Sequence, residues 1–166
     1  MTSSSAAKST RVPRDKSGWW FAIPLRRGGY AVALVARNKP STIMLVYALD
    51  RYFAEIPELS ELGGVGPADC LPARMLTGHY IKDGLWPLIH RHPGFTREDW
   101  PIPVFFRVPP LGGPAYMTTF KEDDLAANDV EIRYVPGTDP RERDYPETLG
   151  GDWGLHNYFN HKFNPL

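Results

Sequence analysis

The sequence lacks several features that mark common classes of protein. Among its 166 residues it has one cysteine, Cys70, so no disulfide can form within the chain and the fold does not depend on an oxidising compartment. No stretch approaches the roughly 18 apolar residues of a membrane-spanning helix. The first 18 residues also lack the apolar run of a signal peptide. These absences predict a cytoplasmic protein with no membrane partner.

An overall surplus of charge of one sign is also missing. The chain has 19 basic and 19 acidic residues, and its formal net charge is zero. Proteins that grip a nucleic-acid backbone usually concentrate basic residues on one face, and no such concentration is visible, so we expect no nucleic-acid partner. Residues 121–152 do hold ten acidic and four basic residues. If clustered in space, they would suit a basic protein partner, whereas a solvated surface loop is the simpler interpretation.

Local signatures of catalysis are absent as well. The sequence contains no P-loop, no G-x-G-x-x-G after a strand, no H-E-x-x-H and no G-x-S-x-G. Many active sites leave no such signature, so a small metal- or cysteine-dependent enzyme remains an alternative. Its ligands would come from four histidines near Asp83 or Asp152, and its nucleophile would be Cys70 beside His79. The four histidines are His90, His92, His156 and His161. Ordinary packed or surface roles are the favoured interpretation of these residues, and we predict no metal and no cofactor.

Proline and glycine, by contrast, are abundant. The 17 prolines and 15 glycines leave almost no uninterrupted stretch long enough for a long helix, and they indicate short elements joined by many turns. Residues 1–17 have almost no large apolar side chains and are predicted to form a disordered tail. Residues 18–166 are predicted to form a single domain.

Alternating apolar residues predict a series of short strands. Residues 19–25 and 30–37 flank a turn that contains Gly28 and Gly29, which is typical of a β-hairpin. Residues 57–62 are expected to form a helical turn. Further strands are expected at residues 41–49, 79–82, 86–90, 103–108, 116–120, 130–135 and 153–163. The predicted fold is mainly β (α+β at most), a small, strongly curved antiparallel sheet or partly open β-barrel with one or two short helices. A barrel that binds a small ligand is a further alternative.

Five short motifs occur in order along the predicted domain. They read GWWFAIPL (residues 18–25), GYAVA (29–33), FAEIPEL (53–59), GLWPLI (84–89) and REDWPIPVF (97–105). In this order they resemble the immunity protein 26 family of bacterial polymorphic toxin systems, over residues 18–125. Departures occur at residues 48–51 and at His90, and the C-terminal portion matches less well.

The resemblance implies a small protein that binds and blocks a cognate toxin and has no catalytic residues. The motif residues are then interpreted as scaffold rather than as a binding site. They are Pro24, Trp86, Pro87, Trp100, Pro103 and Phe105. Immunity proteins that face nucleases often offer acidic surfaces to basic grooves, which makes the acidic residues after Phe120 the candidate contacts. These are Glu122, Asp123, Asp124, Asp129 and Glu131.

Overall fold

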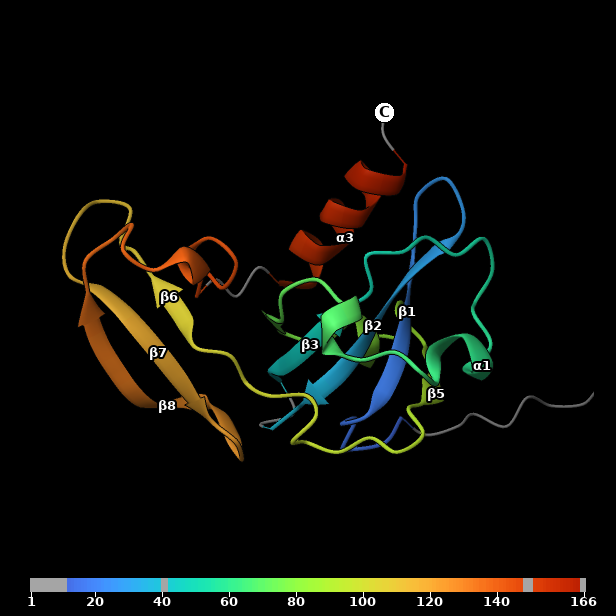
Figure 1. The fold of residues 1–166 in the computed structure, drawn as a ribbon. Helices are drawn as coiled ribbons and strands as arrows, with labels where there is room; N and C mark the ends of the chain where they lie inside the picture. The colour runs from blue at the N-terminus through green and yellow to red at the C-terminus, as the bar shows by residue number, and fades with distance from the viewer. Residues whose placement is uncertain (1–11, 40–41, 148–150, 165–166) are drawn as a thin grey trace, which may run out of the picture.

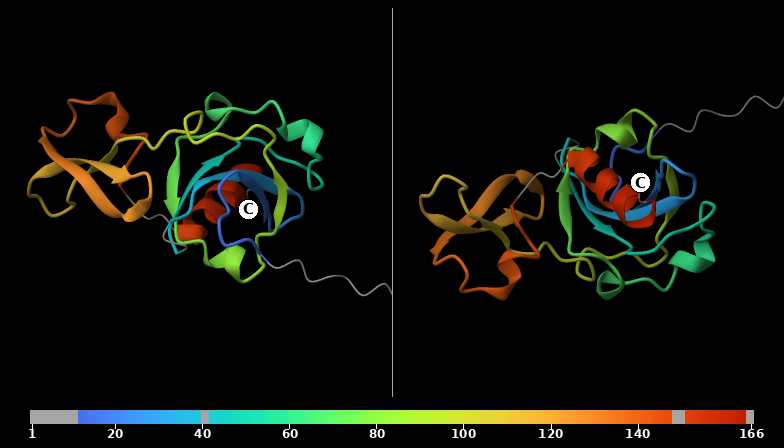
Figure 2. Two further views of the ribbon diagram at one scale, coloured as in Figure 1. Left: turned by 90° about the horizontal axis from the view of Figure 1, so that it is seen from below. Right: turned by 90° about the horizontal axis from the view of Figure 1, so that it is seen from above.

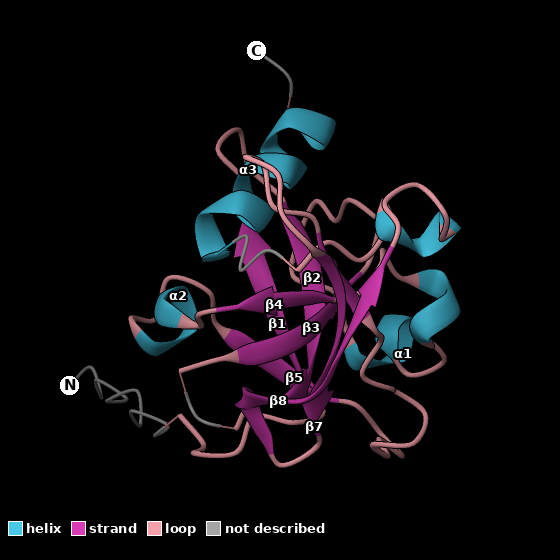
Figure 3. Cartoon of the chain, turned by 90° about the vertical axis from the view of Figure 1, so that its left-hand side faces the viewer, coloured by secondary structure: helices cyan, strands magenta, loops and turns pink. Residues whose placement is uncertain are grey.

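The computed structural model describes residues 12–39, 42–147 and 151–164 (Figure 1). Within these residues, eight strands form two antiparallel sheets, which are not closed into a barrel. The mainly β fold class predicted from the sequence is confirmed. We call the five-stranded sheet the large sheet and the three-stranded sheet the small sheet. Figure 3, which colours the chain by secondary structure, shows the strands at the centre and the helices around them.

The large sheet has the strand order β4-β3-β2-β1-β5. Its strands are β1 (Trp19–Pro24), β2 (Tyr30–Arg37), β3 (Met44–Ala48), β4 (Arg74–Leu76) and β5 (Leu88–Arg91). The predicted hairpin of β1 and β2 is confirmed, with Pro24 opposite Tyr30. Gly28 and Gly29 have φ angles of 93° and 77°, which only glycine adopts readily, and a Cβ on Gly29 would lie 2.4 Å from the Tyr52 ring. Sequence chemistry therefore determines this turn.

Both faces of the large sheet are buried. In β2 the even-numbered residues Val32 and Leu34 pack into one apolar cluster, and the odd-numbered Ala33 and Val35 pack into a second. Successive side chains of a strand point to opposite faces, so an unbroken apolar strand supplies two cores at once. Trp100 lies in the first cluster, and helix α3 (Gly151–Phe163) contributes to the second. Figure 2 shows α3 lying over the large sheet, with the small sheet set to one side.

The small sheet has the order β6-β7-β8. It consists of β6 (Phe105–Arg107), β7 (Ala115–Lys121) and β8 (Asp124–Tyr134). A short extended segment adjoins the free side of β6, where Phe106 N–H donates to Tyr145 O (2.8 Å) and Glu147 N–H donates to Phe106 O (2.7 Å). The other side of the small sheet ends at β8.

Two predicted strands are helices in the structure. Residues His79–Lys82 form α2, because Gly78 takes a φ of 70° and the Asp152 carboxylate accepts hydrogen bonds from Gly78 N–H (2.9 Å) and Tyr80 N–H (2.7 Å). That capping group lies more than 70 residues away in the sequence, so no local pattern reveals it. Residues 153–163 belong to α3, in which Leu155 and Phe159 lie four residues apart on one buried helix face.

The other predicted elements are present with shifted ends. The helical turn predicted at residues 57–62 is α1 (Leu59–Leu62). Strand β8 begins six residues before the predicted start, and β4 was not predicted. Of the predicted N-terminal tail, residues 1–11 lie outside the described residues, while Lys16 is buried and its N–H donates to Asn38 Oδ1 (2.7 Å).

Candidate functional site at the junction of the two sheets

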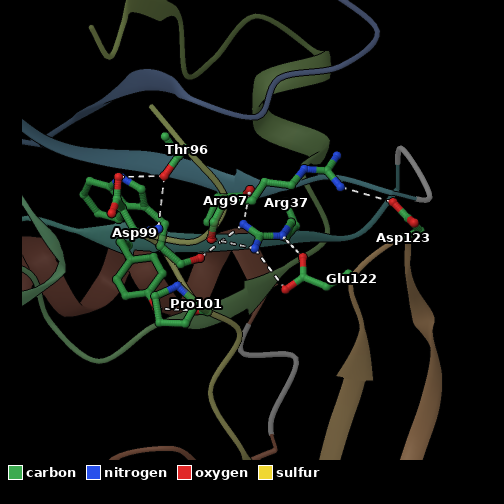
Figure 4. A network of polar contacts seen from close by, with 10 residues as sticks. Arg37, Thr96, Arg97, Asp99, Pro101, Glu122 and Asp123 are labelled. Atoms are coloured by element: carbon green, nitrogen blue, oxygen red, sulfur yellow. Dashed lines mark hydrogen bonds and ion pairs between the residues drawn. The ribbon is translucent and has the colours of Figure 1, made fainter. Parts of the chain in front are cut away.

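A buried arginine marks the place where the two sheets meet. Arg37 ends β2, and its side chain is only 1% exposed. A guanidinium group has five N–H donors, and a buried one needs an acceptor for each. Arg37 Nε donates to Glu122 Oε2 (2.5 Å) and Nη2 donates to Glu122 Oε1 (3.1 Å), which makes a two-pronged ion pair between the large and small sheets (Figure 4).

Three backbone carbonyls take the remaining donors of Arg37. Nη1 donates to Ala36 O (2.9 Å) and Trp100 O (3.1 Å), and Nη2 donates to Arg97 O (2.9 Å). All five donors are therefore satisfied. Sequence reasoning missed Arg37, although a charged residue that ends an otherwise apolar strand is a signal that could have found it.

The loop that supplies two of those carbonyls is held in shape by its own contacts. Thr96 Oγ1 donates to Asp99 Oδ2 (2.6 Å), and Tyr47 Oη donates to Pro101 O (2.5 Å) (Figure 4). Burial raises the pKa of Tyr47 to about 12, so its hydroxyl stays protonated and remains a donor at neutral pH. The acceptors around Arg37 thus belong to a fixed loop.

The turn between β7 and β8 carries three of the predicted contact residues. We call Glu122, Asp123 and Asp124 the acidic tip. Two contacts add to the ion pair between Glu122 and Arg37. The Asp123 carboxylate accepts from Arg97 Nη1 (3.1 Å), and the buried Leu125 donates its N–H to Lys39 O (2.7 Å). These contacts fix the acidic tip against the large sheet. The side chains of Glu122 and Asp123 nevertheless stay 57% and 75% exposed, so both carboxylates can reach a partner.

The structure separates the other two predicted contacts from the acidic tip. Glu131 lies within β8, opposite Thr118 of β7, and forms an ion pair with Arg107 of β6. The side chain of Asp129 lies outside the described residues. Of the five predicted acids, the structure therefore brings three together at one exposed turn.

A cavity of about 610 Å³ opens beside the acidic tip. Four basic and two acidic residues line it, together with two neutral polar ones. They are Arg14, Asp15, Ser17, Arg37, Asn38, Lys39, Arg97 and Glu122. Ser17 Oγ is buried and has no hydrogen-bond partner among the described residues. A recess with this lining suits a polar or charged side chain of a partner.

Three of the four histidines considered as metal ligands make a ring hydrogen bond to a backbone carbonyl, and no such bond is made by the exposed His161 among the described residues. His90, His92 and His156 each place Nε2 3.1 Å from a backbone carbonyl, of Pro57, Val65 and Pro24 respectively. A carbonyl only accepts, so in each ring Nε2 carries the proton. Across residues 12–39, 42–147 and 151–164, no group of three or more His, Cys, Asp or Glu side chains could hold a metal ion.

Cys70 and Asp152 also have structural surroundings. Burial raises the pKa of the Cys70 thiol to about 12, and the nearby Asp69 carboxylate adds to this effect, whereas a nucleophilic thiol needs a lowered pKa. Asp152 is buried and caps α2 as described above. Neither residue has the surroundings that the enzyme alternative requires.

The motif residues interpreted as scaffold occupy buried, half-buried and exposed positions. Trp86, Trp100 and Phe105 are at most 2% exposed, and Trp86 stacks on Phe21 with ring centroids 5.6 Å apart. Pro24 and Pro87 are exposed, but their carbonyls accept hydrogen bonds from His156 and from Ala22 N–H. Pro103 is half-buried.

None of the helices in the described part of the chain combines the length and the apolar character needed to cross a membrane. In a comparison with known protein families, the sequence model of Immunity protein 26 matches residues 16–116. No curated protein and no solved structure matches the chain.

Proposed function

The chain belongs to the immunity protein 26 family, and from this premise we propose that it binds a cognate toxin domain and neutralises it by protein–protein contact. The family match is the observation that carries this proposal, because it suggests a toxin-neutralising role. We further propose that the protein is not an enzyme and that it acts in the cytoplasm. Blocking a toxin requires a specific interface of roughly 800 Å² on each partner, with a few anchoring residues.

We propose that the acidic tip and the neighbouring cavity form the centre of that interface. Glu122 is fixed by the buried Arg37, and Asp123 by Arg97, so the carboxylates are held in place before a partner arrives. Preorganised charges lose little conformational entropy on binding. Three consecutive acidic residues at an exposed turn suit a basic surface, such as the substrate groove of a nuclease toxin.

The position of the acidic tip relative to the family match also supports this assignment. The match ends at Tyr116, within β7, so the acidic tip and β8 lie beyond it. The buried Trp86, Trp100 and Phe105 lie inside it. We propose that the matched part supplies a shared scaffold and that the β7–β8 hairpin supplies contacts specific to one toxin.

Co-expression with the proposed cognate toxin domain tests the proposed interface. The double variant Asp123→Lys/Asp124→Lys reverses two exposed charges and leaves the Arg37–Glu122 pair intact, so the protein should fold but fail to protect the cell. A matched control, Glu55→Lys/Asp83→Lys, changes the net charge equally at exposed positions away from the tip, and it should protect fully. Full protection by the tip variant would remove the acidic tip from the interface.

A further inference from the structure

The small sheet ends in an unpaired strand. Among the described residues, β7 is the one strand that pairs with β8, and the free side of β6 is occupied by residues 145–147. The outer edge of β8 meets another segment near its start, where Leu125 N–H donates to Lys39 O, and the pairing considered below involves residues 130–134. Every second residue of an edge strand directs its N–H and C=O away from the sheet, where they are open to another strand. Among the described residues, β8 is therefore the edge strand at which the small sheet can accept another strand (Figure 1).

The sequence of β8 is complementary to itself. Residues 130–134 read VEIRY, with Ile132 at the centre. If a second β8 pairs antiparallel with Ile132 opposite Ile132, Glu131 of each strand lies opposite Arg133 of the other. Residues directly opposite in an antiparallel pair interact most strongly, and opposite charges there are favourable.

The side chains needed for this pairing are available. Glu131 and Arg133 are exposed, and the side chain of Arg133 makes no hydrogen bond or ion pair with the described residues. Glu131 Oε1 accepts a hydrogen bond from Arg107 Nη2, which leaves Oε2 for a second cation. Each copy thus presents one unpaired cation and one carboxylate with a free oxygen.

The opposite face of the small sheet carries apolar side chains that would also meet in the β8–β8 pairing. Phe106, Met117 and Ile132 lie opposite one another on β6, β7 and β8. Ile132 is 52% exposed at the end of this apolar row. In the symmetric pairing the row continues through a second Ile132, so both isoleucines lose contact with water.

We infer that the partner of the β8 edge is a second copy of this chain, joined by antiparallel β8–β8 pairing about Ile132 into one continuous sheet of six strands. The geometry gives a closed two-fold dimer, because the same surface is used on both subunits. The contact is short and smaller than the ~1,200 Å² of stable interfaces, so the dimer should dissociate in the micromolar range. This inference is independent of the proposed toxin contact.

Sedimentation velocity of the full chain between about 5 μM and 1 mM tests the pairing. Wild type should shift from monomer to dimer. Arg133→Glu puts two carboxylates opposite each other at both cross-strand positions and leaves the Arg107–Glu131 pair untouched. It should raise the dissociation constant of the dimer at least about tenfold. The charge swap Glu131→Arg/Arg133→Glu restores both cross-pairs, although it removes the Arg107–Glu131 pair within each subunit, and it should recover dimerisation.

Two controls keep the result specific. Arg143→Glu makes the same charge change at an exposed residue outside β8 and should dimerise as wild type does. Circular dichroism should be unchanged for every variant. A monomer at all concentrations, a charge swap that fails to restore the dimer, or an equal loss in Arg143→Glu would each overturn the inference.

Discussion

At the scale of single residues, Arg37 links the two sheets. A buried guanidinium has lost its hydration, so its stability depends on the acceptors around it. The Glu122 carboxylate is the one charged acceptor, and three carbonyls complete the set. Glu122 therefore has two roles. It joins the small sheet to the large sheet, and it belongs to the acidic tip that we propose as the binding site.

Glu122→Gln should lower the free energy of unfolding by about 2 kcal/mol, because it leaves the buried Arg37 without a counter-charge. The value lies below that of a fully buried pair, since Glu122 is partly exposed and water can approach it. Urea denaturation measures the loss.

The matched control for this effect is Asp123→Asn. It removes the exposed ion pair with Arg97, and it should cost less than about 1 kcal/mol. An equal loss of unfolding free energy in Glu122→Gln and Asp123→Asn would show that the counter-charge of Arg37 does not determine the stability.

Cys70 should react slowly with iodoacetamide in the folded protein. Burial raises the pKa of its thiol to about 12, so at pH 8 the thiolate is about a thousandfold scarcer than for an ordinary thiol. Mass spectrometry of the alkylated chain follows the reaction. Unfolding in urea should restore the ordinary rate, and fast labelling of the folded protein would contradict the packing described for Cys70.

At the scale of elements, helix α3 covers one face of the large sheet with few residues. Phe159 is fully buried and stacks on Phe163, with ring centroids 5.7 Å apart. Trp153, on the same helix, is 67% exposed. The helix is therefore stabilised by packing rather than by its own sequence.

Phe159→Ala should destabilise the protein by about 3–5 kcal/mol, because it opens a cavity under α3. Trp153→Ala should change the stability by less than about 0.5 kcal/mol. Thermal unfolding of both variants gives the comparison, and similar melting temperatures would contradict the placement of α3.

The elements that could be predicted from the sequence are those fixed by nearby residues. Alternating apolar side chains and the Gly28–Gly29 turn suffice for the β1–β2 hairpin. Helix α2 depends on Asp152, which reaches it from a distant part of the chain. The segment of α3 is predicted from the sequence to be a closing strand, but burial of Leu155 and Phe159 on one side favours a helix. In the site, the acids of the tip were predicted, whereas their attachment to Arg37 required the fold.

At the scale of the whole molecule, the two sheets divide the roles that we propose. The large sheet has a core on each face, and all five of its strands lie within the residues that match the family. The small sheet offers an acidic tip at one end of its hairpin and an open edge along β8. A toxin bound at the tip and a second copy at the edge would use different surfaces of the same hairpin.

The central claim is that the chain neutralises a toxin by binding it through the acidic tip. Isothermal titration calorimetry of the purified chain with the proposed cognate toxin domain tests this most directly. We predict binding with one toxin per chain, weakened by added salt, and lost in Asp123→Lys/Asp124→Lys but kept in Glu55→Lys/Asp83→Lys. No heat of binding with the wild-type chain, or equal affinity for both double variants, would contradict the account.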